Sequence, residues 1–245
     1  MISITSPSKT MKEEKVAIET SLPELMEDTH ILAEELLHYT PRDLETLMGI
    51  STALAEKNFR RFQDFHKAEE FPAVYLFRGD VYRGLEVDTL EREDILYLNQ
   101  HLRILSGLYG ALRPLDRIRP YRLEMGIGLR NSRGRNLDTF WGDRIQKLLE
   151  EEADDGIIVN LASKEYARAI RTSRTSLDFY QVDFRERKGS SYRTVALFSK
   201  IARGQMARFI AKNRIDRIDD LKEFNESDYS YQAELSDSHT LVFTR

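Results

Sequence analysis

The chain contains no cysteine. This absence excludes disulfide bonds, thiolate metal sites and cysteine nucleophiles. No run of about 18 apolar residues occurs either, so we expect no membrane-spanning helix. The first residues, MISITSPSKT, lack the charged start and long apolar stretch of a signal peptide, which makes the cytoplasm the expected compartment. No linker rich in glycine, serine or proline divides the 245 residues, and one domain is expected.

Lysine is missing from one long segment, residues 101–136, although this segment carries eight arginines against two acids. Its net charge of +6 contrasts with −10 for residues 11–100, which hold twenty acids and ten bases, and with −4 for the whole chain. Such a segment is expected to face a nucleic acid, a small phosphorylated ligand, or the acidic half of the chain itself. The exclusive use of arginine indicates a geometric demand, because the planar guanidinium suits phosphates and carboxylates alike.

Helical and strand patterns follow one another without a regular βαβ rhythm. Thr40-Pro41-Arg42-Asp43 predicts a helix start, with Thr as N-cap and Pro in the first turn. Apolar runs predict strands at 73–77 and 156–161, and Arg187-Lys188-Gly189-Ser190 predicts a hairpin between 177–185 and 192–198. The other expected elements are strands at 1–7 and 240–243 and helices at 23–39, 51–65, 89–100, 136–151, 163–170, 200–213 and 219–224. The predicted fold is α+β, an irregular mixed α/β arrangement in a single compact domain covering 1–245.

Six sequence blocks occur in order from residue 2 to about residue 215: ISITSPSKT, FRGDVYRGL, HLRILSGLYGALRPLDRIRPYRLEMG, NSRGRNLDTFWGD, NLASKEY and SKIARGQMARFIAKNRI. Together they resemble the YaaA family of peroxide-stress resistance proteins. The family often has Ala where Ser8 stands and Pro where Ser132 stands, but Lys9, Arg133 and Gly134 are kept. The resemblance covers nearly the whole chain.

This resemblance implies a cytoplasmic bacterial protein that limits damage during hydrogen peroxide stress and is linked to less free intracellular iron. It also implies DNA binding and a single-domain fold containing a helix-hairpin-helix element. We therefore expect DNA as the partner, duplex or branched, bound independently of base sequence. The sequence indicates no membrane association and identifies no protein partner.

The candidate helix-hairpin-helix covers about residues 91–122, with 105–110 as its turn. In such an element, backbone N–H groups and a helix N-terminus bind phosphate, and nearby arginines add charge. However, two residues separate the glycines where one is usual, and Pro114 disfavours helical geometry at Arg113. A tight structural turn is the alternative for the hairpin, and pairing with the acidic half is the alternative for the arginines. The candidate DNA contacts are Arg103, Ser106, Gly107, Tyr109, Gly110, Arg113, Arg117, Arg119, Arg122, Arg130, Arg133 and Arg135.

A second set of polar residues lies beside turns or helix starts of the matched blocks: Lys9, Asp80, Arg133, Lys200 and Arg203. Helical periodicity places Lys200 and Arg203 away from the apolar face of the 200–213 helix. If the set converges, Lys9, Lys200 and Arg203 form an anion-binding cleft for a nucleotide or a flipped base, with Lys9 and Asp80 as acid–base candidates. The alternative is a buried salt-bridge network. Whether the protein is an enzyme stays open, because no established catalytic motif is present.

Two Glu-x-x-His pairs, Glu27/His30 and Glu35/His38, match the spacing of di-iron carboxylate proteins. Those proteins draw their ligands from four helices, whereas both pairs here fall on one expected helix, so no metal site is predicted. No P-loop, dinucleotide fingerprint or zinc motif occurs, and no cofactor is predicted. Ser163 is expected to cap a helix, and Trp141 to lie in the core.

Overall fold

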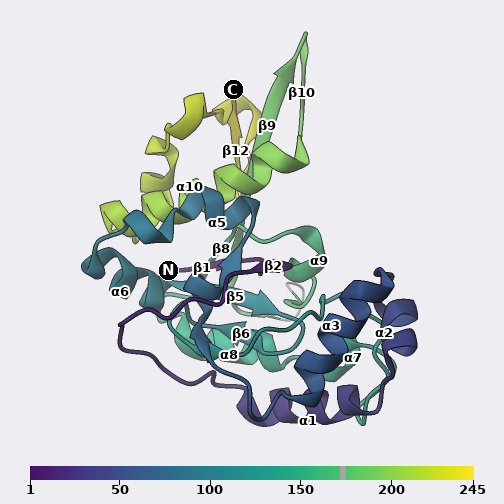
Figure 1. The fold of residues 1–245 in the computed structure, drawn as a ribbon. Coiled ribbons are helices and arrows are strands. Elements are labelled where there is room, and N and C mark those ends of the chain that lie inside the picture. Colours follow the sequence, from purple (N-terminus) through teal and green to yellow (C-terminus); the bar gives the residue numbers. More distant parts are fainter. Residues whose placement is uncertain (172–174) are drawn as a thin grey trace.

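A sheet whose central strands run parallel forms the core of the molecule (Figure 1). The computed structural model describes residues 1–171 and 175–245. The sheet has the order β11-β12-β9-β8-β1-β5-β6, and β10 pairs with β9. Pairing is parallel from β12 through β5 and antiparallel at β6 and β11. These strands are β1 (Ile2–Thr5), β5 (Leu102–Ser106), β6 (Gly110–Leu112), β8 (Ile157–Asn160), β9 (Asp178–Lys188), β10 (Ser191–Arg193), β11 (Ser230–Tyr231) and β12 (Thr240–Thr244).

Two groups of helices lie at opposite ends of the molecule. In Figure 1, α5 lies beside α10, which contacts β9, whereas α1, α2, α3 and α7 lie at the other end. No described helix is long and apolar enough to cross a membrane. The helices are α1 (Met26–Leu37), α2 (Pro41–Met48), α3 (Thr52–Gln63), α4 (Ala73–Leu76), α5 (Asp80–Leu85), α6 (Arg92–His101), α7 (Leu137–Trp141), α8 (Arg144–Glu152), α9 (Lys164–Ala167) and α10 (Ala196–Asn213). Short 3-10 helices are η1 (Val87–Thr89), η3 (Asp219–Glu223), η4 (Glu226–Asp228) and η5 (Ala233–Leu235).

Two small antiparallel pairs tie loops to this framework. β2 (Thr10–Met11) pairs with β4 (Phe77–Arg78), and β3 (Phe71–Pro72) pairs with β7 (Arg117–Ile118). The predicted mixed α/β fold in a single domain is confirmed. The predicted strands near the N-terminus, at 156–161 and at 240–243 are confirmed as β1, β8 and β12.

The helix start predicted at Thr40 is also confirmed. The Thr40 hydroxyl accepts a hydrogen bond from the Asp43 backbone N–H (3.3 Å), and the Asp43 carboxylate accepts one from the Thr40 N–H (2.9 Å). This reciprocal pair satisfies two N–H groups that the helix itself leaves without partners. Gly49, with φ of +59°, ends the helix in the left-handed region.

Two predicted strands are wrong in part. Residues Ala73–Leu76 form a short buried helix, and only Phe77–Arg78 pairs as a strand. An apolar run without periodicity does not distinguish a buried strand from a buried helical turn. The strand predicted over 192–198 ends at Arg193, because α10 begins at Ala196, earlier than the predicted 200.

The predicted helix-hairpin-helix is wrong as well. Helix α6 runs directly into β5, and the glycine turn joins β5 to β6 in a buried β-hairpin. The Ser106 hydroxyl accepts hydrogen bonds from the N–H groups of Leu108 (3.2 Å) and Tyr109 (2.9 Å), so these amides are not free for phosphate. A Cβ on Gly107 would lie 2.3 Å from the Leu123 carbonyl oxygen. Close packing therefore explains this glycine, and the alternative of a tight structural turn holds.

Candidate functional site

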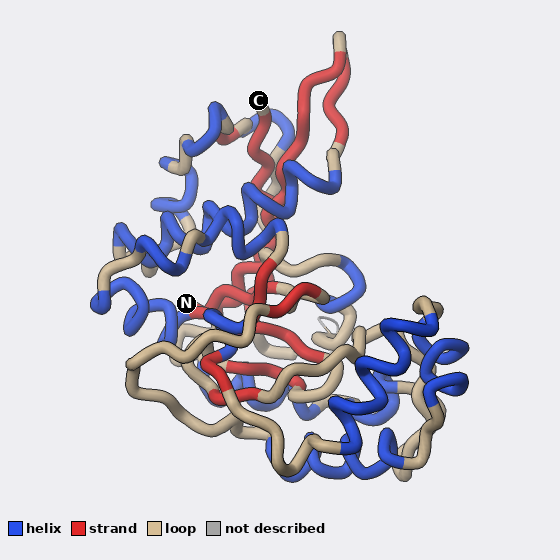
Figure 2. The backbone as a smooth tube through the Cα atoms, viewed as in Figure 1, coloured by secondary structure: helices blue, strands red, loops and turns tan. Residues whose placement is uncertain are grey.

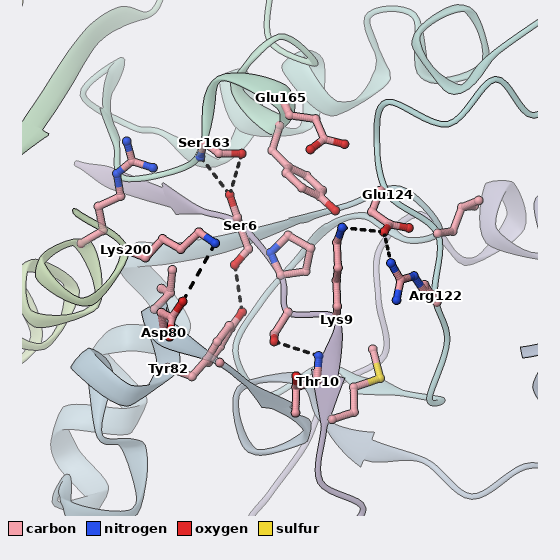
Figure 3. Close-up of a pocket in the computed structure, with 18 of the residues that line it drawn as sticks. Ser6, Lys9, Thr10, Asp80, Tyr82, Arg122, Glu124, Ser163, Glu165 and Lys200 are labelled. Atoms are coloured by element: carbon pink, nitrogen blue, oxygen red, sulfur yellow. Dashed lines mark hydrogen bonds and ion pairs between the residues drawn. The ribbon is translucent and has the colours of Figure 1, made fainter. Parts of the chain in front are cut away.

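A cavity of about 470 Å³ opens where β1 and β8 end (Figure 3). Strands β1 and β8 are neighbours in the sheet. The next strand of this sheet after β1 is β5, which lies toward one edge of the sheet, whereas the next after β8 is β9, which lies toward the opposite edge. Ligands of open α/β sheets bind at such a reversal of strand order, outside the carboxyl ends of the strands. The sheet topology therefore places this pocket where a ligand is expected.

Hydrogen bonds fix the loop that follows β1. The Ser163 backbone N–H donates to the Ser6 hydroxyl (2.9 Å), and the Tyr82 hydroxyl donates to the Ser6 carbonyl oxygen (3.2 Å), as Figure 3 shows. Gly79 has φ of +139°, and a Cβ there would lie 2.6 Å from the Ser8 hydroxyl oxygen. The next residue along the chain from Ser8 is Lys9, so these contacts position the lysine at the pocket.

A close helix crossing brings α5 and α10 to the same pocket. A Cβ on Gly84 would lie 2.0 Å from the Ile201 carbonyl oxygen, and one on Gly204 would lie 1.8 Å from the Val81 carbonyl oxygen. Only glycine permits this approach of two backbones. The crossing places Asp80, the first residue of α5, 4.0 Å from the Lys200 amine of α10.

Two carboxylates at the pocket, those of Asp80 and Glu124, each pair with two cations. Lys200 and Arg83 both contact the Asp80 carboxylate, Arg83 at 3.6 Å. On the opposite wall, the Lys9 amine and the Arg122 guanidinium each lie 2.9 Å from one oxygen of Glu124 (Figure 3). Because Lys9 and Lys200 keep more than half of their side-chain surface exposed, both amines remain available to a ligand.

Arg203 is the cation of the pocket that no acid neutralises. Among the described residues it forms no ion pair, and its buried Nε has no hydrogen-bond partner. Burial lowers the pKa of Arg203, against the opposing effect of Asp183, but an arginine stays protonated in proteins. A buried, unpaired positive charge is costly to maintain, so an anionic ligand would stabilise the pocket.

Three tyrosines contribute aromatic rings to the lining. Tyr82, Tyr121 and Tyr166 are at most 7% exposed. Burial raises the pKa of each of these hydroxyls above its ordinary value, so they stay neutral. Aromatic walls beside cations suit a ligand that has both a flat ring and a negative charge.

The structure brings four residues of the predicted set together at this pocket: Lys9, Asp80, Lys200 and Arg203. Arg133, the fifth member of the predicted set, lies elsewhere, because its guanidinium pairs with Asp28 and stacks over Phe140 at 4.5 Å. Sequence reasoning gave no role to Ser6, Tyr82, Glu124, Glu165 and Tyr166, which also line the cavity. The polar residues directly after β1 were the available signal for Ser6.

The arginines predicted to contact DNA lie mostly in ion pairs within the protein. Arg103 and Arg113 both bind Glu152, at 2.5 and 2.6 Å. Arg119 and Arg117 lie 2.9 and 3.8 Å from Glu70 of the acidic half. The alternative of pairing with the acidic half therefore describes Arg117 and Arg119, whereas Glu152, the partner of the other two, lies outside residues 11–100. Of the eight arginines in residues 101–136, only Arg122 lines the pocket.

Burial removes further residues from the predicted DNA contacts. Ser106, Gly107, Tyr109 and Gly110 are buried, and Arg103 is only 4% exposed, so a phosphate backbone cannot reach them in this fold. Arg130 and Arg135 are exposed, and neither forms an ion pair with any residue between 1–171 or 175–245. Among the predicted DNA contacts, these two arginines are therefore accessible to a phosphate backbone.

Glu27, His30 and Glu35 lie on α1, and His38 directly follows its last residue, so the two Glu-x-x-His pairs share one helix and its C-cap. The rings of His30 and His66 approach to 5.7 Å, and His66 lies 2.7 Å from Glu34. In the part of the chain that is described, no three histidine, aspartate or glutamate side chains are grouped so that they could hold a metal ion.

Comparison with known proteins agrees with the matched blocks. Residues 1–235 match the family model described as "Peroxide stress protein YaaA". A UPF0246 protein of Psychrobacter sp. (strain PRwf-1) is 41% identical over 265 residues, which covers 100% of this chain and 98% of the relative. A UPF0246 protein of Legionella pneumophila (strain Corby) is 39% identical over 255 residues, covering 100% and 99%. The chain therefore belongs to the peroxide stress protein YaaA family.

Proposed function

We propose that this protein serves the peroxide stress response by binding a nucleotide in the pocket and acting on it there. The observation that carries the proposal is Arg203, a partly buried cation that forms no ion pair with a described residue, in a cavity with two exposed lysine amines. A cavity of 470 Å³ falls in the range of about 300–1,000 Å³ that is usual for small-ligand pockets. A phosphate next to Arg203 and Lys200 would supply the missing negative charge.

In this proposal the two walls of the pocket have different roles. Arg203 and Lys200, on consecutive turns of α10, bind the phosphate, and the tyrosine rings pack against the base. Lys9 and Asp80 are the acid–base groups, because each carries a titratable side chain into the cavity beside an oppositely charged partner. Glu124 positions Lys9 and is itself held by Arg122.

Nucleotide binding is tested by calorimetry with a deoxynucleoside monophosphate. Lys200→Met should weaken binding about tenfold, because it removes a charged hydrogen-bond donor to the phosphate. Lys212→Met is the matched control, since Lys212 is an exposed lysine on the same helix. Equal affinities for the two variants would refute the pocket as a phosphate site.

Chemistry at Lys9 is tested in cells that depend on this protein for peroxide survival. Lys9→Ala should abolish protection and leave the folded protein at normal abundance. Lys9→Arg keeps the charge next to Glu124 but replaces the amine with a guanidinium, which cannot give up its proton in a protein, so it should also fail to protect. Survival equal to wild type with either variant would remove Lys9 from the mechanism.

The free iron of the same cells, measured by electron paramagnetic resonance, tests the link with iron that the resemblance implies.

DNA binding by the central arginine segment, residues 101–136, is a second candidate. It is supported by Arg130 and Arg135, which are exposed and make no ion pair with a described residue. Phosphate contacts of this kind need charge and exposure but no base-edge chemistry. In this narrower form, two arginines and not twelve residues carry the contact.

A further inference from the structure

Strand β9 extends beyond the sheet to which it belongs. It pairs with β8 through residues 178–181 and with β12 through 181–185, and past Arg185 its strand partner is β10. Figures 1 and 2 show the resulting two-stranded ribbon projecting from the body of the molecule. We call residues 186–193 the ribbon.

The cations of the ribbon are free of acidic partners. Arg187, Lys188 and Arg193 are exposed, and none forms an ion pair within the described residues. Glu186, the acid of the ribbon, is bound instead by Arg245 at 2.9 Å and by the Tyr229 hydroxyl. The projecting end of the ribbon therefore carries a net positive charge that the protein itself does not neutralise.

The strand register places these charges on both faces of the ribbon. Arg187 lies opposite Tyr192 on one face, whereas Lys188 and Arg193 lie on the other, opposite Ser191 and Glu186. A planar lipid surface would contact one face at a time. A nucleic acid groove, which has phosphates along both walls and admits a two-stranded ribbon, can contact both faces together.

Aromatic and apolar side chains stand beside the cations. Tyr192 is 38% exposed, and Leu197 and Phe198 at the base of the ribbon are 45% and 39% exposed. An exposed tyrosine ring between cations is suited to stacking on an unpaired base. Helix α10 begins three residues after the ribbon and carries Lys200 and Arg203 to the pocket, so only Thr194 and Val195 separate the ribbon from the helix that leads to the pocket.

We infer that the ribbon is a polynucleotide-binding element and that the pocket takes a nucleotide that belongs to a nucleic acid strand. The second half of this inference rests on the proposed function, whereas the ribbon contact does not depend on the pocket. The ribbon binds the sugar–phosphate backbone without reading base sequence, and α10 directs one nucleotide of the bound strand toward Arg203. The substrate class is therefore a polymer and not a free nucleotide.

The test compares two triple variants that change the net charge equally. The ribbon variant is Arg187→Glu, Lys188→Glu, Arg193→Glu, and the control is Lys57→Glu, Lys67→Glu, Arg92→Glu, three exposed cations without ion pairs among the described residues. Fluorescence anisotropy is measured with a labelled single strand and with the corresponding duplex. The ribbon variant should bind at least tenfold more weakly than the control, and its log–log salt slope should be smaller by about 2 to 3. All six positions are exposed, and thermal unfolding checks that both variants fold.

Three results separate the possibilities. Equal oligonucleotide affinity of the ribbon variant and the control would overturn the inference, as would wild-type protein that binds no oligonucleotide. Ribbon-dependent binding to phosphatidylglycerol vesicles, with unchanged oligonucleotide affinity, would overturn it in favour of a lipid surface. If the ribbon variant loses oligonucleotide affinity while Lys200→Met keeps full affinity for the mononucleotide, the inference about the ribbon holds and the proposed function of the pocket fails.

Tyr192→Ala should weaken single-strand binding by about tenfold and duplex binding less, because only unpaired bases stack on the tyrosine ring.

Discussion

Two cationic regions of this molecule handle their charge in opposite ways. The central arginine segment has eight arginines, but acids from other elements neutralise most of them, and Arg103 is only 4% exposed. The ribbon has three cations, which project into solvent without acidic partners in the described chain. The comparison teaches that charge density along a sequence does not give the charge that a surface presents to a partner.

The difference arises from where the acids lie. Glu152 on α8 reaches two arginines of the central segment, and Glu70 before β3 reaches two more. Removing one member of a buried pair leaves the other charge without compensation, which costs more than the pair itself contributes. A variant of the central segment should therefore act on stability, and a variant of the ribbon on binding.

The largest effect is expected for Arg103→Met. The Arg103 guanidinium binds Glu152 and also donates to the carbonyl oxygens of Asn99, Gln100 and Leu102 at the end of α6. Losing it leaves one oxygen of Glu152 and the helix-terminal carbonyls without this donor, although Arg113 still pairs with the other Glu152 oxygen, so unfolding free energy should fall by about 3 kcal/mol. Urea denaturation measures this loss. Arg187→Met on the ribbon should change stability by less than about 0.5 kcal/mol. Similar losses for the two variants would erase the distinction between the regions.

A smaller effect on stability, which depends on pH, is expected for substitution of Glu152, the ion-pair partner of Arg103. Burial raises the pKa of Glu152, but the hydrogen bonds and charges of Arg103 and Arg113 outweigh it, and the net pKa lies below the ordinary 4.5. The carboxylate therefore stabilises the fold fully above about pH 4.5 and loses this contribution as the pH falls through its lowered pKa. Glu152→Gln should cost less than about 3 kcal/mol at pH 7, and the difference from wild type should shrink under acid conditions. Denaturation at a series of pH values measures it.

Neighbouring Asp116 does not hide this effect. Its burial raises its own pKa, so its contribution to stability runs in the opposite direction with pH. Because Asp116 is present in both wild type and Glu152→Gln, its contribution is the same in each and leaves the difference largely unaffected. A difference in unfolding free energy that stays constant from pH 7 down to pH 3 would show that the negative charge of Glu152 does not contribute to stability.

The sequence predicted the fold class and the strands β1, β8 and β12, and it singled out four residues that the structure brings to one pocket. These succeeded because the relevant signals are local: an apolar run, an N-cap such as Thr40, or a cation on the polar side of a helix. Lys9 and Lys200 are far apart in the chain, but both were found because each follows directly from its own local pattern.

The predictions that failed concern residues whose partners lie far away in the sequence. The glycines at 107 and 110 predicted a turn correctly, but nothing nearby shows that β5 must pair with the parallel sheet. Arg133 matched the pocket set in type, but Asp28 and Phe140 hold it elsewhere. The acids that neutralise the central segment come from residues 28, 70 and 152, and one sequence does not reveal such pairings.

The smallest effect is expected for the double variant Arg130→Glu, Arg135→Glu. These arginines are exposed, but Arg130 shares its surroundings with acids, since Glu35 and Asp43 act on the same Tyr39 hydroxyl as Arg130 does. Nearby negative charge weakens the attraction to phosphate, so duplex affinity should fall only about two- to threefold, against at least tenfold for the ribbon variant. Anisotropy titrations at equal salt make the comparison. A loss as large as that of the ribbon variant would show that the central segment, despite its ion pairs, presents its charge to DNA.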